Sequence, residues 1–89
     1  MRFSAYIGKV IDGDSFRAVS EDMRLEGVYA PEINSERGRK AKAKLEGLIL
    51  GKNIEYEEQA RDVYRRLIVQ VWLSGMNVNL AMKRYVESL

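Results

Sequence analysis

The stretch VIDGDSFRAVSEDMRLEGV, which runs from Val10 to Val28, decides the fold because it alternates strand-like runs with turn residues. Ser15–Ser20 and Met23–Val28 are predicted as strands, since apolar and polar side chains alternate along an extended backbone. Asp12-Gly13 and Glu21-Asp22 are predicted as the turns that precede them. With one further strand upstream, these elements predict a three-stranded meander.

Strands and helices are predicted on both sides of this meander. The upstream strand covers Arg2–Ile11, and downstream Pro31 ends the strand ladder because it has no N–H. Asn34 or Ser35 is expected to open a helix that Gly51 ends. The later elements are expected as strands over Asn53–Glu58 and Leu67–Leu73, a turn at Ser74-Gly75, the short segment Met76-Asn77-Val78 and a final helix capped by Asn79.

Both helices carry an apolar stripe at helical spacing. The stripes consist of Ala41, Leu45, Leu48 and Ile49 in the first helix, and of Val78, Met82, Tyr85, Val86 and Leu89 in the second. Three strands, a helix, two strands and a helix are typical of a five-stranded OB-type barrel, in which closure removes exposed strand edges. We therefore predict a mainly β fold with two helices, with an open α+β sheet as the alternative.

Composition restricts both the architecture and the chemistry. The 89 residues, 46% of them hydrophobic, are expected to form one domain over 1–89. The chain has no cysteine, which excludes disulfides and thiolate zinc sites. It also has no histidine, so catalysis must use carboxylates, arginine, lysine or tyrosine.

Charge alone does not indicate a partner, because the net charge is only +2. A basic cluster is interpreted first as a solvated helix face, and it consists of Arg37, Arg39, Lys40, Lys42 and Lys44. No apolar stretch approaches membrane-spanning length and no signal peptide is recognised. The chain is therefore expected to be soluble, either in the cytoplasm or as a mature secreted fragment, with no membrane contact.

Three segments could carry chemistry, although each also has a structural explanation. The carboxylates of Asp12 and Asp14 flank a glycine and could bind a hard cation, but Asp-Gly also indicates a type I′ hairpin turn. Arg24 could be an exposed strand residue, and Glu32 a loop carboxylate that favours a helix start. The segment Arg61–Arg66 could be a charged surface loop. Only the joint pattern of the three segments favours a functional site.

That joint pattern resembles the staphylococcal nuclease-like (thermonuclease) family. The segments that carry the resemblance are VIDGDS, MRLEGVYAPE, GRKAKAKLEGLILGK, RDVYRRLIVQVW and NVNLAMKRY, in this order from about Tyr6 to the chain end. The resemblance implies an OB-type barrel and a hydrolase that cleaves phosphodiester bonds in DNA or RNA with calcium.

The resemblance also implies roles for individual residues. Asp14 matches a calcium-binding carboxylate and the backbone carbonyl of Ala30 a second ligand position, while Glu32 matches the glutamate that activates or orients the attacking water. Arg24 and Arg66 match two arginines that hold the phosphate, and Tyr64 a tyrosine near the phosphate of the bound nucleotide. Guanidinium groups suit this role because they bind phosphate oxygens bidentately.

Three positions depart from the family pattern. Tyr29 stands where the family has an aspartate that is its second calcium carboxylate, and a neutral phenol is a poor calcium ligand. Arg65 replaces a glycine that precedes the second arginine, and Val63 occupies a position that can carry a lysine. We therefore expect weak calcium binding.

Two functions are predicted from these features. The first is a weak calcium-dependent nuclease that acts on single-stranded DNA or RNA. The alternative is a catalytically impaired OB-fold module that binds nucleic acid or a protein partner through the same cleft. The oligomeric state is left open, with a monomer as the expectation.

Overall fold

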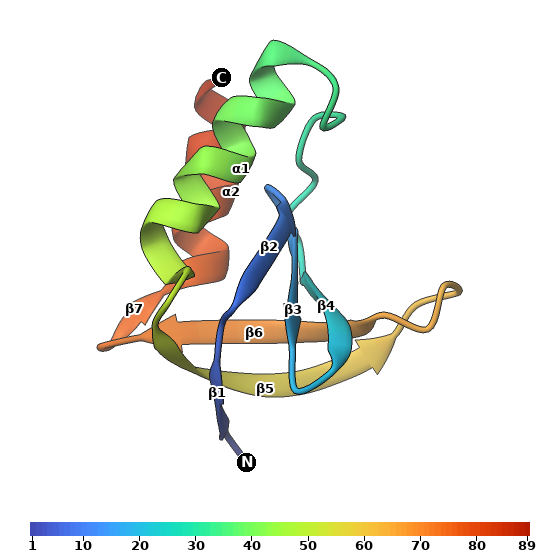
Figure 1. Ribbon diagram of the computed structural model, residues 1–89, viewed down its shortest axis with the longest axis vertical. Helices are drawn as coiled ribbons and strands as arrows, with labels where there is room; N and C mark the ends of the chain where they lie inside the picture. The colour runs from blue at the N-terminus through green and yellow to red at the C-terminus, as the bar shows by residue number, and fades with distance from the viewer.

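The strands predicted around VIDGDSFRAVSEDMRLEGV are present, with shifted boundaries. The computed structural model describes residues 1–89. Its elements, drawn in Figure 1, are β1 (Phe3–Tyr6), β2 (Lys9–Asp12), β3 (Ser15–Ala18), β4 (Glu21–Leu25), α1 (Glu36–Ile49), β5 (Asn53–Arg61), β6 (Leu67–Leu73), β7 (Met76–Asn77) and α2 (Val78–Ser88).

The predicted first strand, Arg2–Ile11, is divided into β1 and β2 at Ile7-Gly8. The Ile7 N–H donates to the Lys52 carbonyl at 3.0 Å, and the Gly51 N–H donates to the Ile7 carbonyl at 2.8 Å. These bonds hold the break against the segment that follows α1. β1 pairs antiparallel with β5, whereas β2 pairs antiparallel with β3. The single predicted strand is therefore bent into two strands, which pair with different parts of the sheet.

The second predicted turn, at Glu21-Asp22, is wrong. The turn lies at Val19 and Ser20, whose φ angles of 52° and 62° are left-handed. Positive φ at both central residues is the geometry that matches the twist of a two-residue hairpin. Arg17 explains the error, because its Nη1 donates to Asp22 Oδ1 at 2.7 Å across the strand pair. The acidic residues thus belong to β4, which begins earlier than predicted and ends at Leu25.

The sheet curls into a half-barrel with the order β1-β5-β6-β4-β3-β2, and β7 pairs with β6. β4 and β6 are parallel, with Met23 opposite Leu67, and the other pairs are antiparallel. Because the two outer strands of this order, β1 and β2, are consecutive in the chain, the sheet bends round on itself rather than lying open (Figure 1). The prediction of a mainly β fold with two helices is confirmed. β5 extends past its predicted end to Arg61.

The core lies between the curled sheet and the inner faces of the helices. From α1, Ala41, Leu45 and Ile49 are buried as the stripe predicts, while Leu48 is only partly buried. The largest buried side chains from the strands are Phe16, Met23, Leu25, Ile54, Val69 and Val71, and α2 adds Val78 and Met82. Burial of this apolar surface is the main stabilising contribution to the fold.

The helix ends follow side-chain capping. Ser35 caps α1, since its hydroxyl accepts from the Gly38 N–H at 2.9 Å. Gly51, with a φ of 76°, follows the end of α1, as predicted for its terminator. The predicted cap of the last helix is wrong, because Asn77, not Asn79, accepts from the Leu80 N–H at 3.0 Å. Asn79 is buried inside α2 and bonds to the sheet instead.

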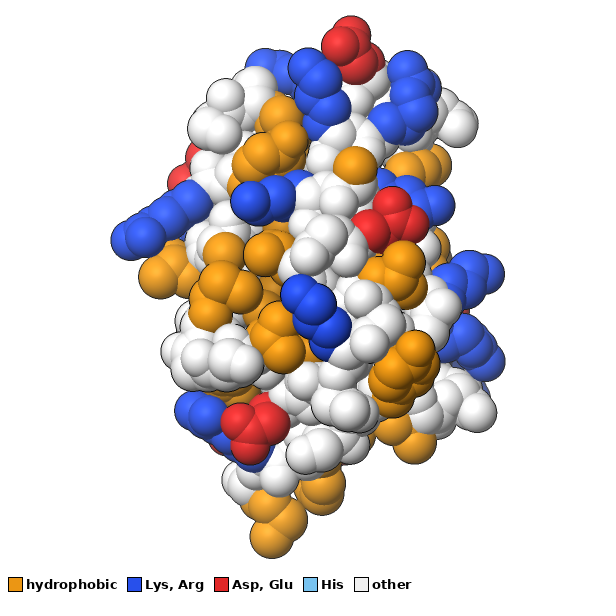
Figure 2. Space-filling model, turned by 60° about the vertical axis from the view of Figure 1, so that its left-hand side comes forward, with side chains coloured by type: hydrophobic (Ala, Val, Ile, Leu, Met, Phe, Trp, Pro, Cys, Tyr) orange, Lys and Arg blue, Asp and Glu red, His pale blue; other side chains and the backbone are white.

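The basic cluster of α1 lies on the outer side of that helix. Lys42 is half-buried and the other four members of the cluster are exposed, which agrees with a solvated face. On the face drawn in Figure 2, cationic side chains are spread among apolar ones and are not gathered into one patch. Both α1 and α2 fall short of the length and apolar character that a bilayer-crossing helix needs.

Candidate functional site

The turn between β2 and β3 packs tightly against the rest of the molecule. A Cβ on Gly13 would lie 2.5 Å from the Ala41 Cβ in α1 and 2.9 Å from the Ala30 Cβ. Gly13 does not have a positive φ, so the turn is not the type I′ turn that Asp-Gly indicates. Glycine is needed here because a helix and a loop approach the backbone closely. The same close approach brings Asp14 to the loop that follows β4.

Asp14 is bonded through both carboxylate oxygens. Its Oδ1 accepts from the Ser15 hydroxyl at 2.9 Å, and its Oδ2 accepts from the Ala30 N–H at 3.1 Å. Oδ2 also lies 4.0 Å from the Arg24 Nη2. The Asp14 side chain is only 13% exposed, so these contacts lie in a partly desolvated place where charge interactions are stronger than in water.

Arg24 extends from β4 beside this carboxylate. Ser15 and Arg24 are register partners of β3 and β4, which places Arg24 next to the Asp14 turn. Its Nη2 donates to the Val28 carbonyl at 2.9 Å, and its side chain is 15% exposed. The Arg24 guanidinium carbon lies 4.9 Å from the centre of the Tyr29 ring, a cation–π contact. The guanidinium is thus held between the loop backbone, Asp14 and an aromatic ring.

Arg66 reaches the same place from the loop between β5 and β6. Its Nε donates to Asp62 Oδ2 at 2.7 Å, and its Nη1 donates to the Ser15 hydroxyl oxygen at 3.3 Å. Arg65 has a φ of 65°, the left-handed conformation that favours glycine, which is the residue that the resemblance implies at this position. Tyr64 is 78% exposed, with its ring centre 5.7 Å from the Arg66 guanidinium carbon.

Asp62 organises the loop that carries Arg66. Its Oδ1 accepts from the backbone N–H groups of Tyr64 and Arg66, both at 2.9 Å. Burial raises the pKa of Asp62, but the hydrogen bonds from Arg66 and Tyr64 outweigh this effect, so the pKa lies below its usual range. Asp62 is therefore charged at neutral pH and holds Arg66 in place.

Glu32 is not bonded to these groups. Its backbone carbonyl accepts from the Ser35 N–H at 3.0 Å, which ties the loop to the first turn of α1. The Glu32 side chain is exposed and makes no hydrogen bond or ion pair with the protein. A Cβ on Gly38 would lie 1.8 Å from the Glu32 carbonyl oxygen, so only glycine allows the loop to lie so close to the helix. The structure thus joins Asp14, Arg24 and Arg66 but leaves the Glu32 carboxylate in solvent.

The residues present do not fit a calcium ion well. Calcium takes about six to eight oxygen ligands, several of them anionic. No three carboxylates are placed so that they could hold a metal ion together, both Asp14 oxygens already accept hydrogen bonds, and Ala30 contacts Asp14 through its N–H. Burial and the adjacent Asp14 raise the pKa of Asp12 to about 6, so this neighbour is a weaker anion than an ordinary aspartate.

Two members of this cluster are absent from the sequence predictions. Ser15 lies between Asp14 and Arg66 and is 2% exposed, but a single serine in a strand gives no functional signal. Asp62 could have been noticed as an acidic residue four positions before Arg66, a spacing that is informative mainly in helices.

Comparison with known families identifies the family of the chain. The sequence model described as "Staphylococcal nuclease homologue" matches residues 22–85, which is more than half of the chain. The chain belongs to this family. The matched range of the staphylococcal nuclease homologue family contains Arg24, Tyr29, Glu32 and Arg66, whereas Asp14 lies upstream of it. The fold is accordingly the OB-type domain of this family.

Two curated relatives carry the name "Uncharacterized endonuclease", one from Escherichia coli O157:H7 and one from Escherichia coli. Each is 33% identical over 81 residues, an alignment that covers 85% of this chain and 53% of the relative. The chain therefore spans about half the length of the curated relatives it matches. Membership of the staphylococcal nuclease homologue family supports a nuclease-type function and binding to nucleic acid, at the level of the family.

Proposed function

We propose that this domain binds a nucleic acid strand by holding one backbone phosphate between Arg24 and Arg66, and that it hydrolyses the phosphodiester bond slowly. The observation that carries the proposal is the continuous contact chain Arg24–Asp14–Ser15–Arg66. It brings two guanidinium groups, far apart in the sequence, to adjacent residues of one turn. Arginine pairs of this kind bind a phosphate through several charge-assisted hydrogen bonds.

Both guanidinium groups have donors left for a phosphate. Each guanidinium has five N–H donors. Arg24 donates one of them to the Val28 carbonyl, and Arg66 donates two, one to Asp62 and one to Ser15. Asp14 and Asp62 offset part of this attraction, and hydrogen bonds from backbone and hydroxyl donors spread the negative charge of each carboxylate beyond the arginines. The side chains of Arg24 and Arg66 are only 15% and 30% exposed, which strengthens the attraction for a phosphate oxygen.

For hydrolysis we assign Glu32 as the base. A water oxygen would form a bond to phosphorus while Glu32 takes the water proton, and the ester P–O bond would break with solvent protonating the leaving oxygen. The two arginines would stabilise the charge that builds on the phosphate oxygens. The exposed position of Glu32 supports a slow reaction, since the base has no partner to orient it. Calcium is expected to bind weakly, because few anionic ligands are available and both Asp14 oxygens already accept hydrogen bonds.

Binding without cleavage is the second candidate function. It is favoured by the engagement of both Asp14 oxygens and by Tyr29, which takes an expected aspartate position and lies against Arg24 instead. A phosphate can still bind to two arginines when no metal is held.

Binding is tested with labelled single-stranded oligonucleotides over a series of salt concentrations. Affinity should fall with salt, and an Arg24→Ala, Arg66→Ala double variant should bind at least tenfold more weakly and with a smaller salt slope. The control is Arg2→Ala, Arg17→Ala, which removes the same charge from exposed ion pairs elsewhere. Equal losses in the two double variants would show a non-specific charge effect and would contradict the proposed phosphate site.

Cleavage separates the two candidate functions. Glu32→Gln should abolish cleavage and leave oligonucleotide affinity nearly unchanged. Tyr29→Asp should raise both the calcium affinity and the cleavage rate, because it adds an anionic ligand beside Asp14. The wild-type protein is also tested at high protein and calcium concentrations. If it binds strands through Arg24 and Arg66 but never cleaves them, hydrolysis is contradicted and only the binding function stands.

A further inference from the structure

A hollow of about 360 Å³ opens beside Tyr29, the residue whose ring contacts Arg24, and it is separate from the phosphate contacts and from the core. It is lined by Gly27, Tyr29, Lys83, Val86 and Glu87, so the loop after β4 forms one wall and the outer side of α2 the other. Its volume lies at the lower end of the range of small-molecule sites, and its lining combines an aromatic and an aliphatic side chain with a lysine and a glutamate. Its position next to Arg24 follows from the Arg24–Tyr29 contact.

Tyr29 is the aromatic wall of this hollow. Tyr29 is 76% exposed, so its ring is accessible to a ligand. One face of the ring meets the Arg24 guanidinium at 4.9 Å, which fixes the ring and leaves its other face available. A ring held in this way is a preorganised surface on which a flat group can stack at little entropic cost.

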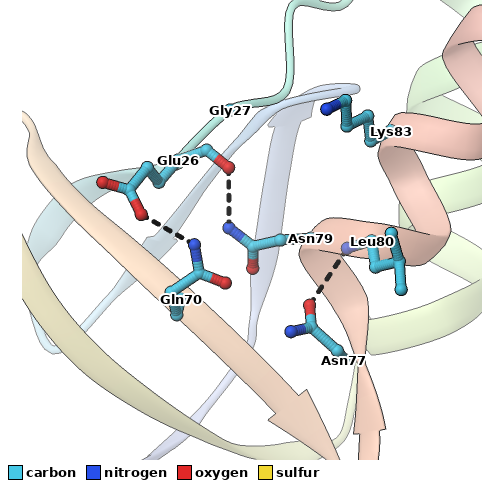
Figure 3. Close-up of a pocket in the computed structure, with 7 residues that line it drawn as sticks. All are labelled: Glu26, Gly27, Gln70, Asn77, Asn79, Leu80 and Lys83. Carbon is cyan, nitrogen blue, oxygen red and sulfur yellow. Dashed lines mark hydrogen bonds between the residues drawn. The ribbon is translucent and has the colours of Figure 1, made fainter.

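The neighbouring hollow, shown in Figure 3, shares Gly27 and Lys83 with the first. Its amides are already engaged in holding the fold. The Asn79 Nδ2 donates to the Glu26 carbonyl at 3.0 Å, and the Gln70 Nε2 donates to Glu26 Oε1 at 2.8 Å. Lys83 makes no ion pair with the protein, and its ammonium group is available at the junction of the two hollows. This arrangement gives the Tyr29 hollow a second cation on its α2 side.

We propose that the hollow at Tyr29, Val86 and Lys83 is a nucleobase site, in which one unpaired base of the bound strand stacks on the Tyr29 ring while the adjacent phosphate lies on Arg24. The inference rests on the proposed phosphate-binding function. It identifies the substrate class as single-stranded nucleic acid, because a base inside a duplex has both faces covered by its neighbours and cannot reach the ring. Lys83 then contacts the next phosphate along the strand.

The alternative occupant, a protein partner, fits the hollow less well. Five lining residues with a lysine and a glutamate at the rim give too small and too charged a surface for a stable protein interface. A planar base with phosphates on either side matches both the aromatic wall and the two cations. Ribose and deoxyribose strands carry the same bases except that uracil replaces thymine, and both present a planar face for stacking, so DNA and RNA strands are compared directly in the test.

The test measures the affinity of short single-stranded DNA and RNA of one sequence, with abasic sites placed at one position at a time. In the wild-type protein, removing the base that occupies the hollow should weaken binding roughly 5- to 150-fold, the range for one base stacked on an aromatic ring. Tyr29→Ala should weaken binding of the intact strand by the same factor. In this variant the abasic site should cause no further loss of affinity. Tyr29→Phe should bind like the wild type, since stacking needs no hydroxyl group.

The controls separate stacking from indirect effects. Tyr6→Ala removes another exposed tyrosine, one that has no contact with Arg24, and should change nothing. A fully abasic strand should bind equally to wild type and Tyr29→Ala, because its phosphates still meet Arg24. Equal weakening of the intact and fully abasic strands by Tyr29→Ala would overturn the base site and show that Tyr29 acts only by holding Arg24.

The two proposals fail in different ways. Binding that depends on Arg24 and Arg66 but is unchanged in Tyr29→Ala would overturn the base site and leave the phosphate site standing. Wild-type protein that binds no DNA or RNA strand, or binds it without need of the arginines, would overturn both. Preference for duplex over single strands of the same sequence would also overturn the base site.

Discussion

Arg66 and Ser15 are 51 positions apart in the chain, yet the Arg66 Nη1 donates a hydrogen bond to the Ser15 hydroxyl oxygen at 3.3 Å. The same hydroxyl donates to Asp14 Oδ1 at 2.9 Å. Because Ser15 is only 2% exposed, its hydroxyl is held in place and bridges an arginine and a carboxylate through hydrogen bonds. It connects the two halves of the candidate site, one from the β2–β3 turn and the other from the β5–β6 loop.

Replacing Ser15 by alanine should weaken oligonucleotide binding about fivefold. The variant loses two hydrogen bonds to charged groups, one donated by Arg66 and one accepted by Asp14, each worth about 1.5 to 3 kcal/mol, and only part of this loss affects how Arg66 is aimed at the phosphate. Affinity is measured by fluorescence anisotropy at low salt, with Ser4→Ala, an exposed serine of β1, as the control. Unchanged affinity in Ser15→Ala would show that Arg66 is positioned by Asp62 alone.

The elevated pKa of Asp12 predicts a stability that falls as the pH rises. Burial and Asp14 raise this pKa from 3.8 to about 6, so between these values the folded protein keeps a proton that the unfolded chain has lost. The unfolded state then binds fewer protons, and the free energy of unfolding decreases with pH. Asp12→Asn should remove this slope and add about 1 kcal/mol at pH 7, a figure reduced because Asp12 is half exposed. Urea unfolding at several pH values measures it, and parallel curves for both proteins would contradict it.

Gly38 and Gly47 lie in the same helix and should respond oppositely to alanine. In Gly38→Ala the new Cβ would meet the Glu32 carbonyl oxygen at 1.8 Å, so the loop must move, at a cost of about 1 to 3 kcal/mol. In Gly47→Ala nothing lies within 4 Å, and the better helix propensity should stabilise by up to about 1 kcal/mol. Thermal unfolding of both variants tests the prediction. Stabilisation of Gly38→Ala would mean that Glu32 is not held against α1.

Asn79 and Asn77 form a second matched pair. The Asn79 amide bonds to the Val71 N–H and to the carbonyls of Glu26 and Val69, at 2.8 to 3.0 Å, and joins α2 to the sheet. Asn79→Ala would leave these buried groups without partners and should cost about 3 kcal/mol or more. Asn77→Ala removes only a helix cap, worth about 1 kcal/mol. Chemical denaturation gives both values, and a cost for Asn79 no larger than that for Asn77 would contradict its bridging role.

Arg65 should be a position where glycine stabilises the protein. Its φ of 65° is left-handed, which costs an L-amino acid about 1 kcal/mol that glycine does not incur. Arg65→Gly should therefore raise the melting temperature. Its oligonucleotide affinity should fall only by the small amount that the loss of one exposed charge causes. Arg65→Ala loses the same side chain but keeps the strained angle, so it should show no gain. Equal melting temperatures in the two variants would show that the angle relaxes freely.

Local patterns were enough to predict most of the elements. The apolar stripe of α1, the Ser35 cap, the β6 strand over Leu67–Leu73 and the mainly β architecture all follow from side-chain periodicity and capping chemistry. The errors occurred where one local pattern permits two structures. Glu21-Asp22 is as polar as a turn, but a cross-strand contact with Arg17 draws it into β4. Asn77 and Asn79 are equally good caps, and only the buried carbonyls of the sheet distinguish them.

Residue types and their order were sufficient to suggest a phosphodiester-directed family, because Arg24, Glu32 and Arg66 occur in motifs that are short and contiguous. Which of them meet in space was decided by long-range packing. The parallel pairing of β4 with β6 and the close approach at Gly13 bring Arg24, Asp14, Ser15 and Arg66 together, while the same packing leaves Glu32 in solvent and turns Tyr29 onto Arg24. Contacts of this kind depend on backbone approach between segments dozens of residues apart, and no periodicity within a strand or helix encodes that distance.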